Sequence, residues 1–359
     1  MIKERTFIME YIRIKDIDFN KAFHDGITNV FGIFMATDVD VRLQKDGVTK
    51  FISLNMRDQE VKIDAKKFGA TDEEISQMVN GGVYKANIQV KNYKNSYSCV
   101  LYNFEPCLDV PPSTFVEWAD GMQDASEIIN SALQTIGESI YSELVFNILR
   151  PVWQKFTCWS AANSLHHNMM GGLLVHTAEV IAQSEQIADF WEEKYGPNFI
   201  NKSLLLSGAL LHDVAKIDEL DVDQLYGTTS YSVRATLETH ITMCVSMIDV
   251  EAYKLSFGYP AFATNENGDQ VQTKSQEQID KEKEALSLLK HLILSHHGKK
   301  EWGSPITPSV PEAYILHIAD NISAEMFRFN KTLNSMEQKT SNTVWLNGDM
   351  VSVYKDSSK

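Results

Sequence analysis

The sequence predicts a multidomain protein in which a small β-barrel precedes an all-α helical bundle. Two observations predict these folds. Residues 28–105 are rich in β-branched residues and alternating apolar positions, whereas residues 115–330 carry apolar residues at three- and four-residue spacing. A third observation predicts a linker between the two domains, because the segment 106–114 contains prolines that interrupt regular structure. The 359 residues are enough for two or three domains.

The barrel is predicted after an N-terminal extension, residues 1–27. Five strand-like runs follow, Thr28–Val41, Val48–Met56, Val61–Ile63, Val83–Val90 and Tyr97–Phe104. Acidic residues 72–74 favour a helix N-terminus between the third and fourth runs, and residues 91–95 form a polar turn before the fifth. Five strands with a helix in this place are typical of the Greek-key barrel called the OB-fold. A generic β-sandwich is the alternative.

The region 115–330 is predicted to form helices over 128–148, 172–191, 204–215, 237–253, 281–295 and 311–329. Between two of them, the polar stretch 256–278 is expected to be a surface insertion loop. The tail, residues 331–359, returns to alternating apolar residues and is expected to pack on the body.

The composition excludes several protein classes. Hydrophobic residues make up 43% of the chain, which excludes a disordered or collagen-like protein. No apolar run reaches the ~18–20 residues of a membrane span, and no secretory signal is visible. The 4 cysteines form no CxxC pair, which argues against a zinc ribbon or a disulfide framework. We therefore expect a cytoplasmic protein that does not associate with a membrane.

The charge is unevenly distributed. The net charge of −15 argues against general polyanion binding, yet residues 1–100 carry 15 basic and 14 acidic side chains. The acidic excess lies in the remaining residues, which also contain nine of the 10 histidines. This difference predicts that the two parts of the chain do different work.

Histidines and aspartates on successive predicted helices are the strongest chemical signal. An isolated histidine in an apolar helix is more often a core residue, but the ordered set with an adjacent His-Asp pair is far more specific. Neutral imidazoles and carboxylates bind divalent first-row metals, and a carboxylate can bridge two of them. Lys216, one turn after the pair, is placed to contact a phosphate oxygen. The set consists of His176, His212, Asp213, His240, His296, His297 and Asp320.

The motifs around these residues resemble a known family. Residues 166–177, 210–216, 292–298 and 316–321 resemble the HD-domain metal-dependent phosphohydrolases, and more closely the YhaM-type 3′→5′ exoribonucleases. That family joins an N-terminal OB-fold to an HD domain, in the order predicted above. Three departures affect the expected shape of the substrate channel: Thr239 replaces a usual glycine, residues 256–278 form a longer loop, and the N-terminal stretch is extra.

The resemblance implies a metal-activated water that hydrolyses single-stranded RNA, with DNA as an alternative, from its 3′ end to nucleoside 5′-monophosphates. It implies two divalent ions, with manganese first and cobalt, iron, nickel, magnesium or zinc as alternatives. All seven residues of the set become metal ligands, and Asp213 and Lys216 are the catalytic pair. For His296 and His297 two alternatives are open: they divide between the two ions, or only one of them binds. His166 and His167 match an upstream pair that would contact the substrate, with packing at a helix terminus as the alternative. The resemblance also suggests a homo-oligomer.

The predicted barrel offers a second place for nucleic acid. Single-strand binding uses aromatic platforms and cations, and the final hairpin contains Lys91, Tyr93 and Lys94. Further aromatic and cationic side chains of the barrel are Phe51, Tyr97, Tyr102, Lys62, Lys66 and Lys67. The alternative is that these polar and aromatic residues simply face water.

Two other functions are compatible with parts of the sequence. One is an HD-domain phosphohydrolase of a small nucleotide, such as a deoxynucleoside triphosphate or a cyclic nucleotide, which would have little need of the barrel. The other is a nucleic-acid-binding or scaffolding protein with an inactive HD domain, which missing ligands would have favoured. No ligand of the pattern is missing.

Overall fold

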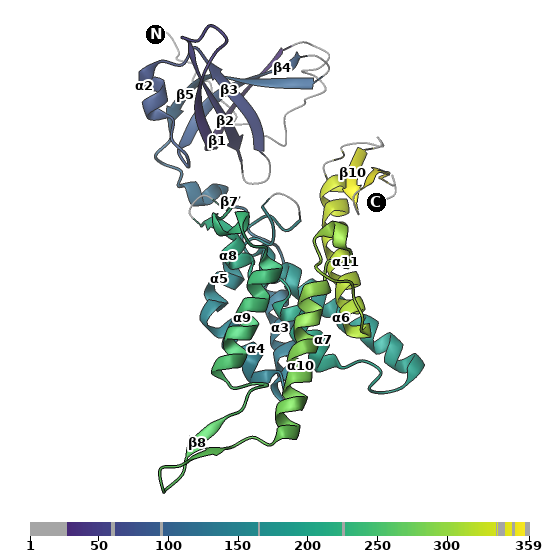
Figure 1. The fold of residues 1–359 in the computed structure, drawn as a ribbon. Helices are drawn as coiled ribbons and strands as arrows, with labels where there is room; N and C mark the ends of the chain where they lie inside the picture. The colour runs from purple at the N-terminus through teal and green to yellow at the C-terminus, as the bar shows by residue number, and fades with distance from the viewer. Residues whose placement is uncertain are drawn as a thin grey trace, which may run out of the picture. The chain divides into compact units, whose positions relative to one another are not determined.

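The computed structural model describes residues 27–58, 62–93, 96–163, 166–224, 227–334, 336, 342–346 and 349–355. Except for Ile27, the predicted N-terminal extension lies outside these residues. The chain divides into two compact units (Figure 1). One comprises Met1–Glu117 with Asp223–Thr228, and the other comprises Trp118–Val222 with Thr229–Lys359.

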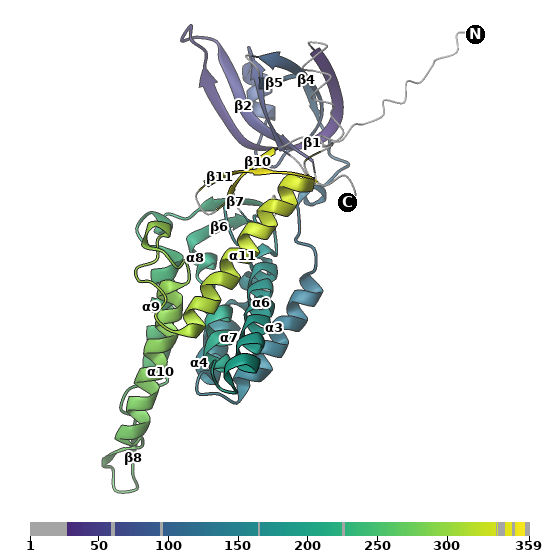
Figure 2. The same cartoon turned by 90° about the vertical axis from the view of Figure 1, so that its right-hand side faces the viewer.

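The first unit contains a closed five-stranded barrel (Figure 2). The strands are β1 (Ile27–Leu43), β2 (Lys50–Arg57), β3 (Lys62–Phe68), β4 (Val83–Tyr93) and β5 (Ser96–Pro106). They close in the order β1-β2-β3-β5-β4, and only the β3–β5 pairing is parallel. The helix α2 (Asp72–Gln77) lies between β3 and β4 in the chain, so the predicted barrel is confirmed.

The long first strand belongs to both sides of the barrel. Its first half pairs with β4 from Ile27 to Met35, and its second half pairs with β2 from Met35 to Leu43. The register shifts between Thr37 and Asp40, where Asp38 has a φ of 54°. An irregularity of this kind bends and twists a strand, which lets β1 turn the corner between its two partners.

Two details of the barrel differ from the prediction. The third strand runs to Phe68 rather than ending at Ile63, because Ala65 continues the inward alternation that a small side chain conceals in the sequence. The polar turn is shorter than predicted, since the ladder between β4 and β5 continues to the pair Tyr93 and Ser96. Backbone hydrogen bonds hold this end of the hairpin and need no apolar side chains.

The second unit is a helical bundle with three small hairpins (Figures 1 and 2). Its helices are α3 (Met122–Gly137), α4 (Ser142–Leu149), α5 (Trp153–Cys158), α6 (Gly172–Tyr195), α7 (Lys202–Leu211), α8 (Lys216–Glu219), α9 (His240–Lys254), α10 (Gln276–Ser295) and α11 (Pro311–Asn334). Short 3-10 turns are η3 (Arg150–Val152), η4 (Arg234–Thr236) and η5 (Lys300–Trp302), and a fourth, η2 (Pro112–Phe115), belongs to the first unit.

The helix predicted over 128–148 is two helices in the structure. Helix α3 ends at Gly137, and a turn follows in which the backbone N–H of Tyr141 donates to the Ser139 hydroxyl at 3.2 Å. Glycine weakens a helix, and a serine side chain competes for the helix's backbone hydrogen bonds. The apolar periodicity therefore continues although the helix ends at Gly137 and a new one begins at Ser142. The helix predicted over 204–215 likewise ends early, at Leu211, before a turn that leads into α8.

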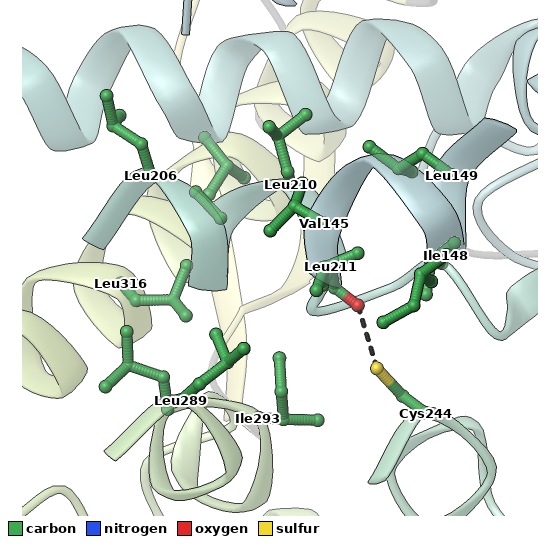
Figure 3. Close-up of a cluster of buried hydrophobic side chains, with 14 of the residues drawn as sticks. Val145, Ile148, Leu149, Leu206, Leu210, Leu211, Cys244, Leu289, Ile293 and Leu316 are labelled. Carbon is green, nitrogen blue, oxygen red and sulfur yellow. Dashed lines mark hydrogen bonds between the residues drawn. The ribbon is translucent and has the colours of Figure 1, made fainter. Parts of the chain in front are cut away.

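The helix α7 lies in the middle of the bundle core. All residues from Leu204 to Leu211 are buried, and Figure 3 shows α7 leucines meeting side chains of α4, α10 and α11. The thiol of Cys244, on α9, donates to the carbonyl of Leu211 at 3.0 Å. Helix α7 ends inside this core immediately before His212, so the apolar packing fixes the start of the chemical site.

The predicted insertion loop contains a hairpin of β8 (Phe262–Thr264) and β9 (Gln270–Gln272), whose strand residues are all exposed. The carboxylate of Glu282 holds its base, because it accepts from the Gly258 N–H at 2.8 Å and from the Lys274 ammonium at 2.6 Å. The strands β6 (Leu220–Asp223) and β7 (Thr228–Tyr231) form a second hairpin.

The tail forms the third hairpin, with β10 (Asn342–Leu346) and β11 (Asp349–Val353), and it contacts α11. Within the described parts of the chain, no helix combines the length and apolar character that crossing a membrane requires.

Candidate metal centre

Helix ends and the interiors of two helices bring the predicted ligands together. His212 and Asp213 directly follow α7, His240 begins α9, and His296 and His297 directly follow α10. His176 and Asp320 lie within the long helices α6 and α11. All seven side chains therefore come from elements that the bundle core holds in place.

The carboxylate of Asp213 lies between two groups of histidines. Its Oδ2 is 3.6 Å from His176 Nε2 and 3.7 Å from His212 Nε2. Its Oδ1 is 3.3 Å from His240 Nε2 and 3.9 Å from His296 Nε2. Each oxygen thus faces its own group, which is the arrangement of a carboxylate that bridges two ions.

Each group can close around a cation. The ligand atoms of His176, His212 and Asp320 lie within 4.8 Å of one another, and so do those of His240, His296 and His297. Asp320 Oδ1 lies 3.2 Å from His176 Nε2, on the side of the first group. Histidine and carboxylate ligands of this kind suit divalent first-row metals.

Four of the five histidines share one orientation. Each donates its Nδ1–H to an acceptor of the protein and directs Nε2 into the cluster, as ligating histidines generally do. The acceptors are the carbonyls of Ala209 for His212 (2.8 Å), Ile293 for His296 (2.7 Å) and Trp302 for His297 (2.8 Å), and the Glu219 carboxylate for His240 (2.9 Å).

The fifth histidine is held through a hydroxyl. His176 Nδ1 lies 2.9 Å from Ser323 Oγ, and the Ser323 hydroxyl donates to Glu179 Oε2 at 2.6 Å. The hydroxyl therefore accepts from the imidazole. The other ring nitrogen of His176, Nε2, therefore faces Asp320 and Asp213.

Buried atoms without partners show that the residues fit cations. Asp213 Oδ1, His240 Nε2 and His296 Nε2 are buried and have no hydrogen-bond partner. A buried polar atom without a partner destabilises a fold by about 1–3 kcal/mol. All three atoms belong to the second group, so a single cation there would satisfy them at once.

The protonation states favour the same role. Burial lowers the pKa of His212, His240 and His296 below 6.5, so these imidazoles are neutral at pH 7 and keep a lone pair on Nε2. Burial alone would raise the pKa of Asp213, but Lys216 and the surrounding histidines hold it well below its ordinary value. Neutral imidazoles around an ionised carboxylate are the forms that ligate metals.

Comparison with known proteins identifies this region. Residues 173–325 match the family model described as HD domain. This segment is an HD domain. The chain is also similar to proteins named 3′-5′ exoribonuclease YhaM from Bacillus subtilis (strain 168), with 28% identity, and from Bacillus velezensis, with 26%. Each match spans 294 residues, 80% of this chain and 82% of the relative.

A third such relative, from Shouchella clausii, is 28% identical over 293 residues, 80% of this chain and 81% of its own. These matches confirm the resemblance to the YhaM-type exoribonucleases, and the small-nucleotide phosphohydrolase is not favoured. An HD domain implies divalent metal binding, in agreement with the ligand groups of the structure.

A cavity of about 340 Å³ opens onto the candidate ligands Asp213, His297 and Asp320 of the HD domain. Lys216 lies in its wall, with Nζ 3.0 Å from Glu219 Oε2. Burial alone would lower the pKa of Lys216, but the carboxylates of Asp213 and Glu219 raise it above 10.5, so the ammonium stays charged. Other residues that line the cavity are Ala162, Asn163, His166, Tyr231, His297, Trp302, His317, Asp320, Asn321 and Arg328.

The structure places the upstream histidine pair in two environments. His166 lines the cavity of the HD domain, with its ring centroid 5.0 Å from that of His176. His167 is buried behind it, where Nε2 lies 3.3 Å from Glu179 Oε2. Gly172 makes this fit possible, because a Cβ there would lie 2.0 Å from the carbonyl oxygen of His167.

The predicted strand-binding residues of the barrel are only partly described. Lys91 lies near the end of β4, paired with Ser98 of β5, and Tyr93 is the last residue of that strand. Lys94 lies outside the described residues. Elsewhere on the barrel, the rings of Phe51 and Phe68 stack with centroids 5.8 Å apart, and Tyr102 is exposed.

Sequence reasoning missed residues that support the ligands. Glu219 orients His240 and pairs with Lys216, and the only available signal was its place three residues after that lysine. Ser323 and Trp302 had no signal, because their contacts join residues of different helices and a turn. The departure at Thr239 is accommodated, since its φ of −96° is ordinary for an N-cap residue.

Proposed function

We propose that this chain is a metal-dependent 3′→5′ exoribonuclease that hydrolyses single-stranded RNA to nucleoside 5′-monophosphates. The observation that carries the proposal is the Asp213 carboxylate, which presents one oxygen to each of two ligand groups. Two ions about 3.5–4 Å apart suit phosphodiester cleavage, because together they stabilise the attacking and the leaving oxygen. The relatives named 3′-5′ exoribonuclease YhaM support the reaction and its direction.

In this proposal each ion has its own set of protein ligands. One set is His176, His212, Asp320 and Asp213 Oδ2, and the other is His240, His296, His297 and Asp213 Oδ1. We propose Mn²⁺ as the physiological ion, since mixed imidazole and carboxylate ligands accept it. When bound, the ions supply an activated water and neutralise charge on the reacting phosphate.

The chain's own residues prepare the site for a phosphate. The Lys216 ammonium faces the cavity and is charged, so it can donate to a phosphate oxygen next to Asp213. Glu219 holds both Lys216 and His240, and its ionised form is favoured because these partners lower its pKa to about 2. His166 lines the same cavity and is proposed to contact the substrate, with His167 supporting it from behind.

The barrel is proposed to bind the strand upstream of the scissile bond through Lys91, Tyr93 and Lys94. The exposed rings of Phe68 and Tyr102, and the balance of 15 basic and 14 acidic side chains in residues 1–100, support this role. We also propose a cytoplasmic location and assembly into a homo-oligomer. Sedimentation of the purified protein would test the assembly.

The first experiment combines purified protein, Mn²⁺ and a 5′-labelled single-stranded RNA, with Asp213→Ala as the control. We expect a ladder that shortens from the 3′ end with the wild-type protein and not with the variant. Failure to cleave RNA or DNA would contradict the proposal. A panel of nucleotides with phosphate detection would then test the small-nucleotide phosphohydrolase.

A further inference from the structure

The turn after α10 places an indole in the cavity. The backbone carbonyl of Trp302 accepts from Nδ1 of the ligand His297 at 2.8 Å. Trp302 lines the same cavity as Asp213 and Asp320. One residue therefore orients a candidate metal ligand with its backbone and brings an indole to the wall of the cavity.

A second ring lies next to the indole and is fixed in the same manner. His317 donates its Nδ1–H to the carbonyl of the ligand His296 at 2.9 Å, and its ring centroid lies 6.0 Å from that of Trp302. A Cβ at Gly298 would lie 2.2 Å from the His317 ring, so only glycine leaves room for it. Both rings are thus anchored to the ligands of the second group.

A cation lies close to the indole. The ammonium of Lys299 lies 4.1 Å from the centroid of the Trp302 ring. The nearby ammonium adds positive charge to this wall, which favours a ligand that carries phosphates.

We propose that the Trp302 indole binds the nucleobase of the 3′-terminal nucleotide by stacking, with His317 as the adjoining wall. The inference rests on the proposed function and adds how that site recognises its substrate. A phosphodiester held between the ligand groups and Lys216 leaves its sugar and base in the remaining cavity, whose volume of about 340 Å³ is in the range of small-ligand sites. Every base has a π-face, so this contact tolerates any sequence.

The test compares two 5′-labelled oligoribonucleotides that differ only at the 3′-terminal residue, which either carries its base or is abasic. We expect wild-type kcat/KM to favour the base by about five- to 150-fold, the range of base–aromatic stacking. Trp302→Ala should abolish this preference, and Trp302→Phe should retain most of it. Metal content should be unchanged in both, because the backbone carbonyl still accepts from His297.

The matched control is Trp191→Ala, which removes an indole that stacks on Tyr195 of α6 and does not line the cavity. It should keep the wild-type preference. Equal wild-type rates on the two substrates, or a preference that persists in Trp302→Ala, would overturn the inference and leave the exoribonuclease intact. If the wild-type protein cleaves neither substrate, the proposed function itself fails. If Trp302→Ala loses metal, the inference is still tested by the kcat/KM preference of the wild-type protein for the base and by the same preference in Trp302→Phe.

Discussion

The barrel and the HD domain use their interiors differently. The barrel core is a cluster of apolar side chains such as Phe34, Ile52 and Ile88. The HD domain buries an equally apolar core around α7, but next to it lie buried imidazoles and carboxylates, including His212, Asp213 and Glu219. Burying such groups opposes folding unless each is paired or bound to a cation. The barrel interior is therefore dominated by apolar packing, whereas the HD interior also carries a candidate site.

The largest expected effect is at the residue shared by both ligand groups. Asp213→Ala should lower hydrolysis by roughly 1,000-fold or more, because metal-ion stabilisation of the transition state is worth several kcal/mol. Metal analysis and RNA cleavage measure the loss. Asp221→Ala, at an exposed position, is the matched control and should behave as wild type. Full activity of Asp213→Ala would sink the assignment of the metal centre.

Metal binding should separate the two units in a melting experiment. Ions at 100 times their dissociation constant should stabilise the HD domain by about 2.7 kcal/mol and leave the barrel unchanged. Calorimetry with and without Mn²⁺ measures the two transitions. No upward shift of the HD-domain transition would show that the orphaned atoms of Asp213, His240 and His296 do not receive a cation.

A smaller effect is expected at the residue that orients His240. Glu219→Gln should weaken metal affinity or activity by about 10- to 100-fold, the usual cost of losing such support. The pKa of Glu219 is lowered to about 2, so the substitution removes a full charge at every working pH. Metal titration measures the change, with the exposed Glu238→Gln as control. Unaltered affinity would mean that Glu219 serves only the fold.

The barrel's contribution to substrate binding should depend on the length of the nucleic-acid strand. Tyr93→Ala combined with Lys94→Ala should weaken binding of long single strands by about 1–2 kcal/mol, of the order of one stacked base. Hydrolysis of a short model diester should be unchanged, because the ligands of the HD domain remain. Binding and cleavage are measured on both substrates. Equal losses on the two would remove the proposed division of labour.

The smallest effect concerns the base of the exposed hairpin. Hydrogen bonds to Gly258 and Lys274 outweigh burial and lower the pKa of Glu282 below 4.5. The Glu282 carboxylate therefore stabilises the fold by about 1 kcal/mol above pH 4.5, its pKa in the unfolded chain. This stabilisation is lost as the pH falls through the lower pKa of the folded protein. Urea unfolding of Glu282→Gln at several pH values tests this, with exposed Glu277→Gln as control. A constant difference between wild type and Glu282→Gln down to the lowest pH would contradict it.

Local pattern determined which elements form and which residue types carry the chemistry. Alternation and helical spacing run along the chain, so the five strands, the helix after β3 and the main helices of the bundle could be predicted from residues close in sequence. The predicted helix over 128–148 was wrong because apolar spacing continues across the turn at Ser139. The spacing of apolar residues does not reveal the hydrogen bond from the Tyr141 backbone N–H to the Ser139 hydroxyl.

By itself the sequence determined a barrel, a bundle and a set of seven candidate ligands, because propensity, periodicity and residue chemistry are local properties. Only the tertiary structure decided that the two oxygens of Asp213 face different histidine groups. It also decided that Glu219, Ser323 and the carbonyl of Trp302 orient His240, His176 and His297. These relations join residues far apart in the chain, and packing of the helices around α7 sets their distances.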